Sequence, residues 1–120
     1  MGSRLKELNP NIKVIAVEPE KSAVLSGEQP GAHKIQGIGA GFIPDLYNSD
    51  IVDAIMKISD EEAYEGARYY AKEEGILVGI SSGAAIYGAL KLAKQLGKGK
   101  KIVAIAPDGG EKYFSVGLYE

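Results

Sequence analysis

A short apolar run, VIAV at residues 14–17, limits the folds open to this chain more than any other segment. The run is enclosed between Pro10 and Pro19, and its apolar residues do not alternate with polar ones. This pattern is typical of a strand that is buried on both faces, as in parallel sheets covered by helices. We therefore predict a strand over residues 13–18 in an α/β fold.

The rest of the chain alternates between strand and helix patterns. After the last turn of a helix over residues 5–8, we predict strands over residues 51–58, 76–78 and 101–106, and helices over residues 60–74 and 84–96. Parallel strands joined through helices need right-handed crossovers. The expected architecture is an open, mainly parallel sheet with helices on both faces, formed by residues 1–120 as a single domain.

The two long helices carry boundary signals. Ser59 and Glu62 have the spacing of a capping box, which satisfies two amide donors and sets the start of a helix at Asp60. Gly75 and Gly97 follow the last apolar positions of the two helices, where a left-handed residue commonly ends a helix. The ends of these helices are therefore predicted more sharply than the ends of the strands.

Residues 20–50 lack periodicity and are rich in glycine and proline, the composition of turns. A connection of about thirty residues is long for a compact domain and is usually functional or disordered. A solvated linker would not carry so many apolar residues, so we expect the segment to be ordered. The apolar residues expected to anchor it are Ile35, Ile38, Phe42, Ile43 and Leu46.

Composition excludes several classes of function. The chain has 120 residues, a net charge of −2, no cysteine and one histidine. No basic patch suggests nucleic acid as a partner, and no apolar run is long enough to span a membrane. Without cysteine, disulfides, thiolate metal sites and thiol nucleophiles are excluded, and a single histidine cannot supply the several imidazoles that most zinc sites need. We expect a cytoplasmic protein with neither nucleic-acid nor membrane partners and no bound metal.

Three glycine-containing turns are candidate ligand sites, because open α/β sheets bind ligands where strands end and helices begin. The turns are GIGAG at residues 37–41, GISSGAA at residues 79–85 and PDGGEK at residues 107–112. Each has a plain structural alternative: a packed glycine turn, a serine helix cap, and a turn with solvated Asp108 and Glu111. His33, the lone histidine, is interpreted as structural or incidental.

Four segments resemble the C-terminal part of cysteine synthases, the O-acetylserine sulfhydrylases of the pyridoxal-phosphate β-family (fold type II). They are VIAVEP at residues 14–19, KIQGIGAGFIP at 34–44, GISSGAA at 79–85 and PDGGEKYFS at 107–115. The similarity covers nearly the whole chain in the family's order and spacing. It implies part of the large, cofactor-binding domain of an enzyme that replaces the acetate of O-acetylserine with sulfide.

The resemblance assigns roles to four residues. Ser81 is expected to face the pyridine nitrogen of pyridoxal phosphate, and Pro107 to line the ring. Gly37 and Ile38 are expected to border the substrate side of the pocket. A hydroxyl gives no strong counterion to a protonated ring nitrogen, so the nitrogen should stay neutral and favour replacement at Cβ over transamination.

Motifs that complete such a site are missing from the chain. The family attaches its cofactor through a lysine, binds the substrate carboxylate in a Ser/Thr- and Asn-containing loop and holds the phosphate in a Gly- and Thr-rich loop, all outside the matching segments. We therefore assign no catalytic residue here and expect an enzyme fragment that is inactive alone and binds no cofactor.

The family further implies an amino-acid substrate, a homo-oligomer and, in some members, docking of a serine acetyltransferase. Three alternatives remain open: a noncatalytic interaction or oligomerisation module, a fragment of a related cystathionine β-synthase-like enzyme, and an unrelated α/β domain that binds a ligand at residues 37–41.

Overall fold

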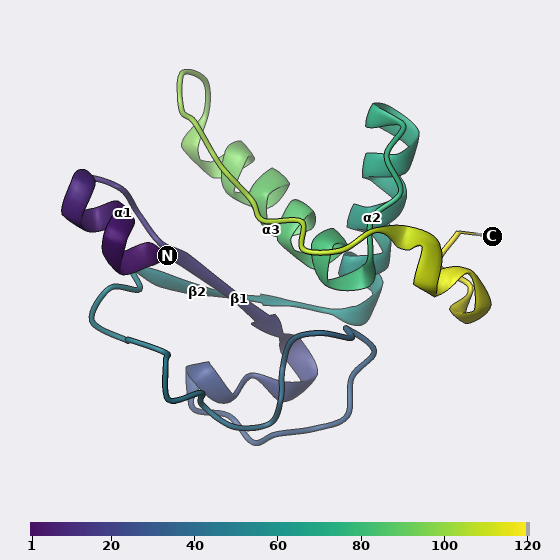
Figure 1. Cartoon of the computed structure of the whole chain (residues 1–120), viewed down its shortest axis with the longest axis horizontal. Helices are drawn as coiled ribbons and strands as arrows, with labels where there is room; N and C mark the ends of the chain where they lie inside the picture. Colours follow the sequence, from purple (N-terminus) through teal and green to yellow (C-terminus); the bar gives the residue numbers. More distant parts are fainter. Residues whose placement is uncertain (120) are drawn as a thin grey trace.

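The computed structural model describes residues 1–119. Its main elements are α1 (Gly2–Leu8), β1 (Ile15–Pro19), β2 (Ala54–Ile58), α2 (Asp60–Glu74) and α3 (Ile80–Leu96), with 3-10 helices at Glu20–Ser22, Val24–Ser26 and Gly110–Val116. The two strands pair in parallel, with Ile15 opposite Ala54 and Pro19 opposite Ile58. Helix α3 contacts both strands, and α2 packs on α3 (Figure 1).

The α/β class is confirmed, but the sheet is smaller than predicted. The described residues form one sheet of two strands, so the strands predicted over residues 76–78 and 101–106 are wrong. Val78 makes only an isolated antiparallel bridge to Gly109. Residues 101–106 form no ladder, and Figure 1 shows this segment separate from the β1–β2 pair. Their apolar, β-branched composition favours a strand, but a strand also needs a hydrogen-bonded neighbour.

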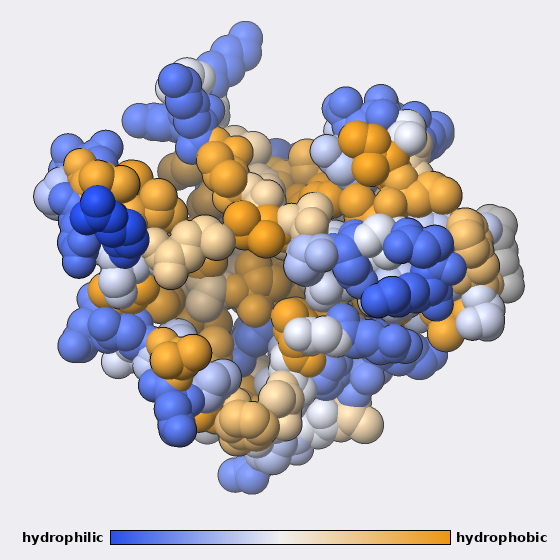
Figure 2. All heavy atoms as spheres, in the orientation of Figure 1, coloured by the Kyte–Doolittle hydropathy of each residue, from blue (hydrophilic) through white to orange (hydrophobic). Residues whose placement is uncertain are grey.

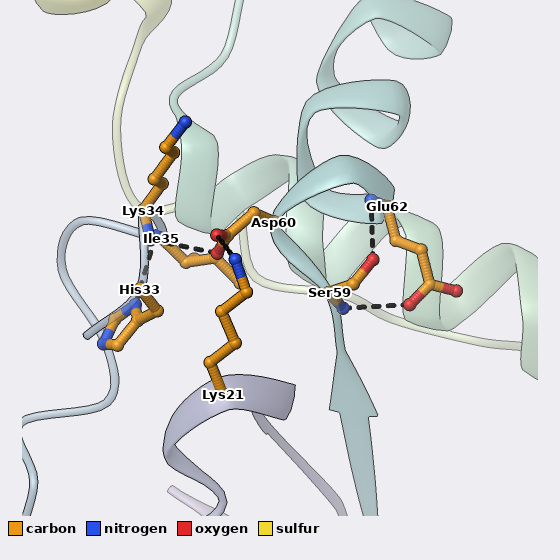
Figure 3. Close-up of polar contacts among 7 residues, drawn as sticks. All are labelled: Lys21, His33, Lys34, Ile35, Ser59, Asp60 and Glu62. Carbon is orange, nitrogen blue, oxygen red and sulfur yellow. Dashed lines mark hydrogen bonds and ion pairs between the residues drawn. The ribbon is translucent and has the colours of Figure 1, made fainter. Parts of the chain in front are cut away.

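Helix α2 begins and ends as the sequence predicted. The Ser59 hydroxyl accepts a hydrogen bond from the Glu62 amide at 3.1 Å, and the Glu62 carboxylate accepts one from the Ser59 amide at 2.9 Å (Figure 3). Gly75 ends the helix with a φ of 71°. The predicted strand over residues 51–58 is shorter, because regular pairing begins only at Ala54.

Helices α2 and α3 approach each other through glycine. A Cβ atom added to Gly66 would collide with the carbonyl of Gly83, and one added to Gly83 would collide with the carbonyl of Ala63. Ala63 and Ala67 are fully buried at this contact. The two backbones are therefore in direct contact, which fixes α3, and with it the start of that helix, relative to α2.

The long segment over residues 20–50 is anchored by fewer apolar residues than predicted. Ala23 and Ile35 are fully buried, and Ile38 packs partly buried against the core. The other three expected anchors, Phe42, Ile43 and Leu46, are 64%, 53% and 98% exposed, so that expectation is wrong. Polar contacts hold this segment in place of those apolar residues.

Candidate functional site

The start of α3 forms the centre of the candidate site. The sequence predicted a helix from Ala84, but the helix begins at Ile80. Gly79 is its N-cap without a side-chain hydrogen bond, so the structural alternative of a serine cap is wrong. Gly79 is required there because a Cβ atom would collide with the carboxylate of Asp108. Ser81 and Ser82 consequently lie in the first helical turn, at the positive end of the helix.

The two serine hydroxyls have different surroundings. Ser82 is fully buried, and its hydroxyl donates to the Asp108 carboxylate at 3.0 Å. Ser81 is 7% exposed, and no side-chain hydrogen bond within residues 1–119 uses its hydroxyl. Ser82 therefore has a structural role, while the Ser81 hydroxyl is left with capacity to bind a ligand at the helix start.

Gly37 lies directly against Ser81. A Cβ atom added to Gly37 would lie 3.4 Å from the Ser81 hydroxyl oxygen, and the φ of Gly37 is +101°, a backbone conformation that favours glycine. The fold thus brings together two predicted site residues that are 44 positions apart in the sequence. Ile38, the next residue, faces the core, and Pro107 is exposed immediately before Asp108.

A partly buried polar network supports the helix start, and no local pattern in the sequence predicts it. Asp108 accepts hydrogen bonds from the hydroxyls of Ser82 and Tyr113, and its carbonyl accepts one from the Gly79 amide at 3.1 Å. The hydrogen bond to Asp108, together with burial, raises the pKa of Tyr113 to about 12. The predicted solvated turn is wrong for Asp108, whereas Glu111 is exposed as expected.

His33 holds the segment that carries Gly37. Its Nδ1 accepts from the Ile35 amide at 3.1 Å, which leaves Nε2 protonated to donate to the Gly39 carbonyl at 2.9 Å. Both ring nitrogens are thus used by backbone groups on either side of Gly37. The contacts agree with the structural interpretation of this histidine.

Asp60 ties the same segment to the start of α2, as Figure 3 shows. Its carboxylate, 5% exposed, accepts from the Lys34 amide at 2.9 Å and from the Lys21 ammonium at 3.0 Å. Burial alone would raise the pKa of Asp60, but these two donors outweigh it and the pKa lies below its ordinary value. Asp60 therefore stays ionised and links three parts of the chain.

Other surfaces show no comparable arrangement of groups. Two shallow hollows are lined by α2 and α3 side chains such as Glu65 and Tyr69, and neither includes Ser81. Nowhere in residues 1–119 do three His, Asp or Glu side chains gather closely enough to hold a metal ion. No helix in this part of the chain has the length and apolar content that crossing a membrane requires.

Comparison with known proteins identifies relatives over nearly the whole chain. It is 56% identical over 119 residues to a cysteine synthase of Staphylococcus aureus (strain N315), covering 99% of this chain and 38% of that protein. The structure matches a cysteine synthase of Entamoeba histolytica with a TM-score of 0.94 and 52% identity, covering 98% of this chain and 35% of that one. An O-acetylserine dependent cystathionine β-synthase of Helicobacter pylori matches with a TM-score of 0.91 and 45% identity, covering 99% and 39%.

The chain thus spans less than two fifths of the length of these relatives. That it corresponds to their C-terminal part stays a prediction. The model of the family described as "Pyridoxal-phosphate dependent enzyme" matches residues 1–108. Because that match takes in most of the chain, this protein belongs to the pyridoxal-phosphate dependent enzymes, within which it matches part of cysteine synthases (O-acetylserine sulfhydrylases).

Proposed function

We propose that residues 1–120 are one unit of the cofactor-binding domain of a cysteine synthase and form one side of its pyridoxal-phosphate site. The observation that carries this proposal is the Ser81 hydroxyl, which lies in the first turn of α3, next to Gly37, without a side-chain partner among the described residues. These residues fit the ring-nitrogen side of the cofactor: a hydroxyl for the nitrogen and a glycine that leaves room beside it.

Each residue of this side has its own role. The Ser81 hydroxyl donates a hydrogen bond to the ring nitrogen, Pro107 lines the ring, and Gly37 and Ile38 border the space for an amino-acid substrate. The cofactor, when bound, supplies the electron sink for replacement at the substrate's Cβ. Because Ser81 places no negative charge at the ring nitrogen, it leaves that nitrogen neutral and keeps the sink weak, which disfavours transamination.

The remaining machinery lies outside this chain. We propose that the lysine, the phosphate loop and the carboxylate-binding loop belong to the part of the relatives' length that the match leaves out. The lysines of this chain lie in no matching motif, so the isolated chain is inactive. The amino-acid substrate is O-acetylserine, and the second substrate is sulfide rather than a thiol that yields cystathionine, which the higher identity to the Staphylococcus aureus cysteine synthase supports.

A chimera tests this function. In the Staphylococcus aureus cysteine synthase, the matching segment is replaced by this chain, and the product is assayed for cofactor absorbance and for cysteine formation from O-acetylserine and sulfide. We expect the chimera to bind the cofactor and form cysteine. A soluble, folded chimera that does neither would contradict the proposal.

Two serine variants in the chimera locate the site. Ser81→Ala should shift the absorbance and fluorescence of the bound cofactor and lower its affinity by about tenfold, because one hydrogen bond to the ring is lost. Ser82→Ala, the matched control, removes a hydroxyl that is bonded to Asp108 and should reduce thermal stability while leaving the cofactor spectrum unchanged. Equal spectra for Ser81→Ala and the parent chimera would remove Ser81 from the site.

A further inference from the structure

The turn at residues 37–41 has few means of its own to keep its shape. Its three glycines have φ values between +65° and +101°, and glycine loses more conformational freedom than any other residue when it is fixed. Phe42 and Ile43, directly after the turn, are more than half exposed. Figure 2 shows exposed hydrophobic side chains over the lower part of the molecule, where Figure 1 places this loop. Contacts from elsewhere must therefore hold the turn beside Ser81.

His33 supplies such contacts on both sides of the turn. Its Nδ1 accepts from the Ile35 amide, and its Nε2 donates to the Gly39 carbonyl. A Cβ atom added to Gly39 would lie 2.6 Å from Nε2 and 2.5 Å from the Cγ atom of Pro19, so the turn lies directly against the imidazole and the end of β1. The ring thus bridges residues 35 and 39 and encloses Gly37.

Only one form of the ring makes both bonds. The Ile35 amide is a donor, so Nδ1 must be without a proton, and the Gly39 carbonyl is an acceptor, so Nε2 must carry one. A protonated imidazole has donors at both nitrogens, and its Nδ1–H would face the N–H of Ile35. Histidine commonly changes charge between about pH 5 and 8. The bridge should therefore be complete in weak alkali and lose its contact with Ile35 in weak acid.

Charged groups of both signs surround the imidazole, as Figure 3 shows. Asp60, at the start of α2, favours a positive ring, whereas Lys21 and Lys34 oppose it. A positive charge on His33 in turn lowers the pKa of Asp60. Asp60 therefore stays ionised and keeps its bonds to Lys21 and to the Lys34 amide when His33 is protonated. Protonation of the ring should thus release the turn and leave the segment before it in place.

We propose that His33 is a positioning residue for substrate binding: the neutral ring holds Gly37 and Ile38 in the shape that borders the amino-acid substrate, and protonation loosens this border. The proposal rests on the proposed function, which gives Gly37 and Ile38 this place. Ile38 is also held by its packing against the core, whereas Gly37 is exposed beside Ser81. Movement of the turn should therefore affect Gly37 most.

The ring can be observed directly, because His33 is the only histidine of the chain. NMR spectra of the isotope-labelled chain give the tautomer at about pH 8 and follow the amides of Ile35, Gly37 and Gly39 down to about pH 5. We expect the proton on Nε2 at the start, and amide signals that shift with the same midpoint as the imidazole. A proton on Nδ1, or amides that do not follow the ring, would overturn the proposal.

Kinetics of the chimera described above test the link to the substrate. At about pH 8, His33→Ala should raise the KM for O-acetylserine about fivefold and leave kcat within about twofold, because the border contacts the substrate equally before and during the reaction. The ratio of the variant's KM to the parent's should fall toward about pH 6, as the parent loses its own bridge. Gln29→Ala, on an exposed residue of the same segment, is the control and should match the parent at each pH.

His33→Asn separates the bridge from a general loss of structure. Its amide oxygen can accept from the Ile35 amide two residues on, as asparagine does in turns, but it cannot be protonated. This variant should recover part of the affinity that His33→Ala loses, and its KM should lack the rise in acid that the parent shows. If His33→Ala does not fold, the comparison of His33→Asn with the parent decides: a KM ratio that stays constant from about pH 8 to about pH 6 would overturn the proposal.

The outcomes separate this inference from the proposed function. A chimera that forms cysteine with the same KM and pH dependence in the parent and in His33→Ala retains the proposed function and overturns the positioning role. A chimera that binds no cofactor overturns the proposed function, and the role of His33 toward a substrate falls with it.

Discussion

Asp60 combines a buried carboxylate with donors from two distant segments, so replacing it tests how residues 20–50 are held. Asp60→Asn keeps an acceptor for the Lys34 amide but loses the ion pair with Lys21. We expect it to lower the free energy of unfolding by about 1–2 kcal/mol, measured by urea titration. Asp45→Asn, on an exposed residue of the same segment, is the control and should stay within about 0.5 kcal/mol of the parent.

Tyr113 should make stability depend on pH only in alkali. Its folded pKa of about 12 lies above that of a free phenol, near 10. A group with a raised folded pKa contributes stability that is fully present below the unfolded pKa and is lost as the pH rises through the folded pKa. Stability should therefore fall between about pH 10 and 12, and the difference between the parent and Tyr113→Phe should shrink over that interval. A difference that does not change with pH would contradict this assignment.

Single residues of the site differ in how far the sequence alone could identify them. Ser81 and Gly37 lie in glycine-rich motifs, so a local pattern marked both, and the fold places them side by side. The contact between Ser82 and Asp108 joins residues 26 positions apart, and neither lies in a pattern that implies the other. Long-range polar contacts of this kind depend on how elements pack, which periodicity does not encode.

The packing of α2 on α3 depends on glycine at the crossing. Gly83→Ala should destabilise the chain by about 2–4 kcal/mol, because the new methyl group meets the backbone of α2. Gly88→Ala is the matched control in the same helix: its methyl group would lie 3.1 Å from the flexible end of Met56, and alanine favours the helix by up to about 1 kcal/mol. Thermal unfolding of both variants checks the contrast, and equal losses would refute the close approach.

Elements whose signals are local were predicted well, and elements that need a distant partner were not. The capping box and Gly75 predicted the first and last residues of α2 correctly, since both signals act within one helical turn. The runs at residues 76–78 and 101–106 have strand composition, but a strand forms only when another chain segment supplies the ladder. The 3-10 helix at Gly110–Val116 was missed by the sequence analysis; its Tyr113 hydroxyl donates to Asp108, and Arg68 binds the Leu118 carbonyl just after the helix.

At the scale of the molecule, two carboxylates join earlier parts of the chain to the starts of β2 and α2. Asp53 accepts from the Lys6 ammonium and the Val14 amide, each at 2.7 Å, and these contacts lower its pKa; Asp60 joins residues 21 and 34 to α2. Both groups have folded pKa values below their ordinary range. They stabilise the fold above the unfolded pKa, near 4, and that contribution is lost as the pH falls through the folded values.

The fold should therefore lose stability in acid, within a defined pH interval. The free energy of unfolding of the isolated chain should decline below about pH 4, with the loss divided between the two carboxylates. In the double variant Asp53→Asn/Asp60→Asn, stability at pH 7 should be lower and its dependence on pH below 4 flatter, because neither replacement can bind a proton there. Urea titrations from pH 7 to about pH 2 measure both curves; an equally steep decline in the double variant would mean that other carboxylates cause the loss of stability in acid.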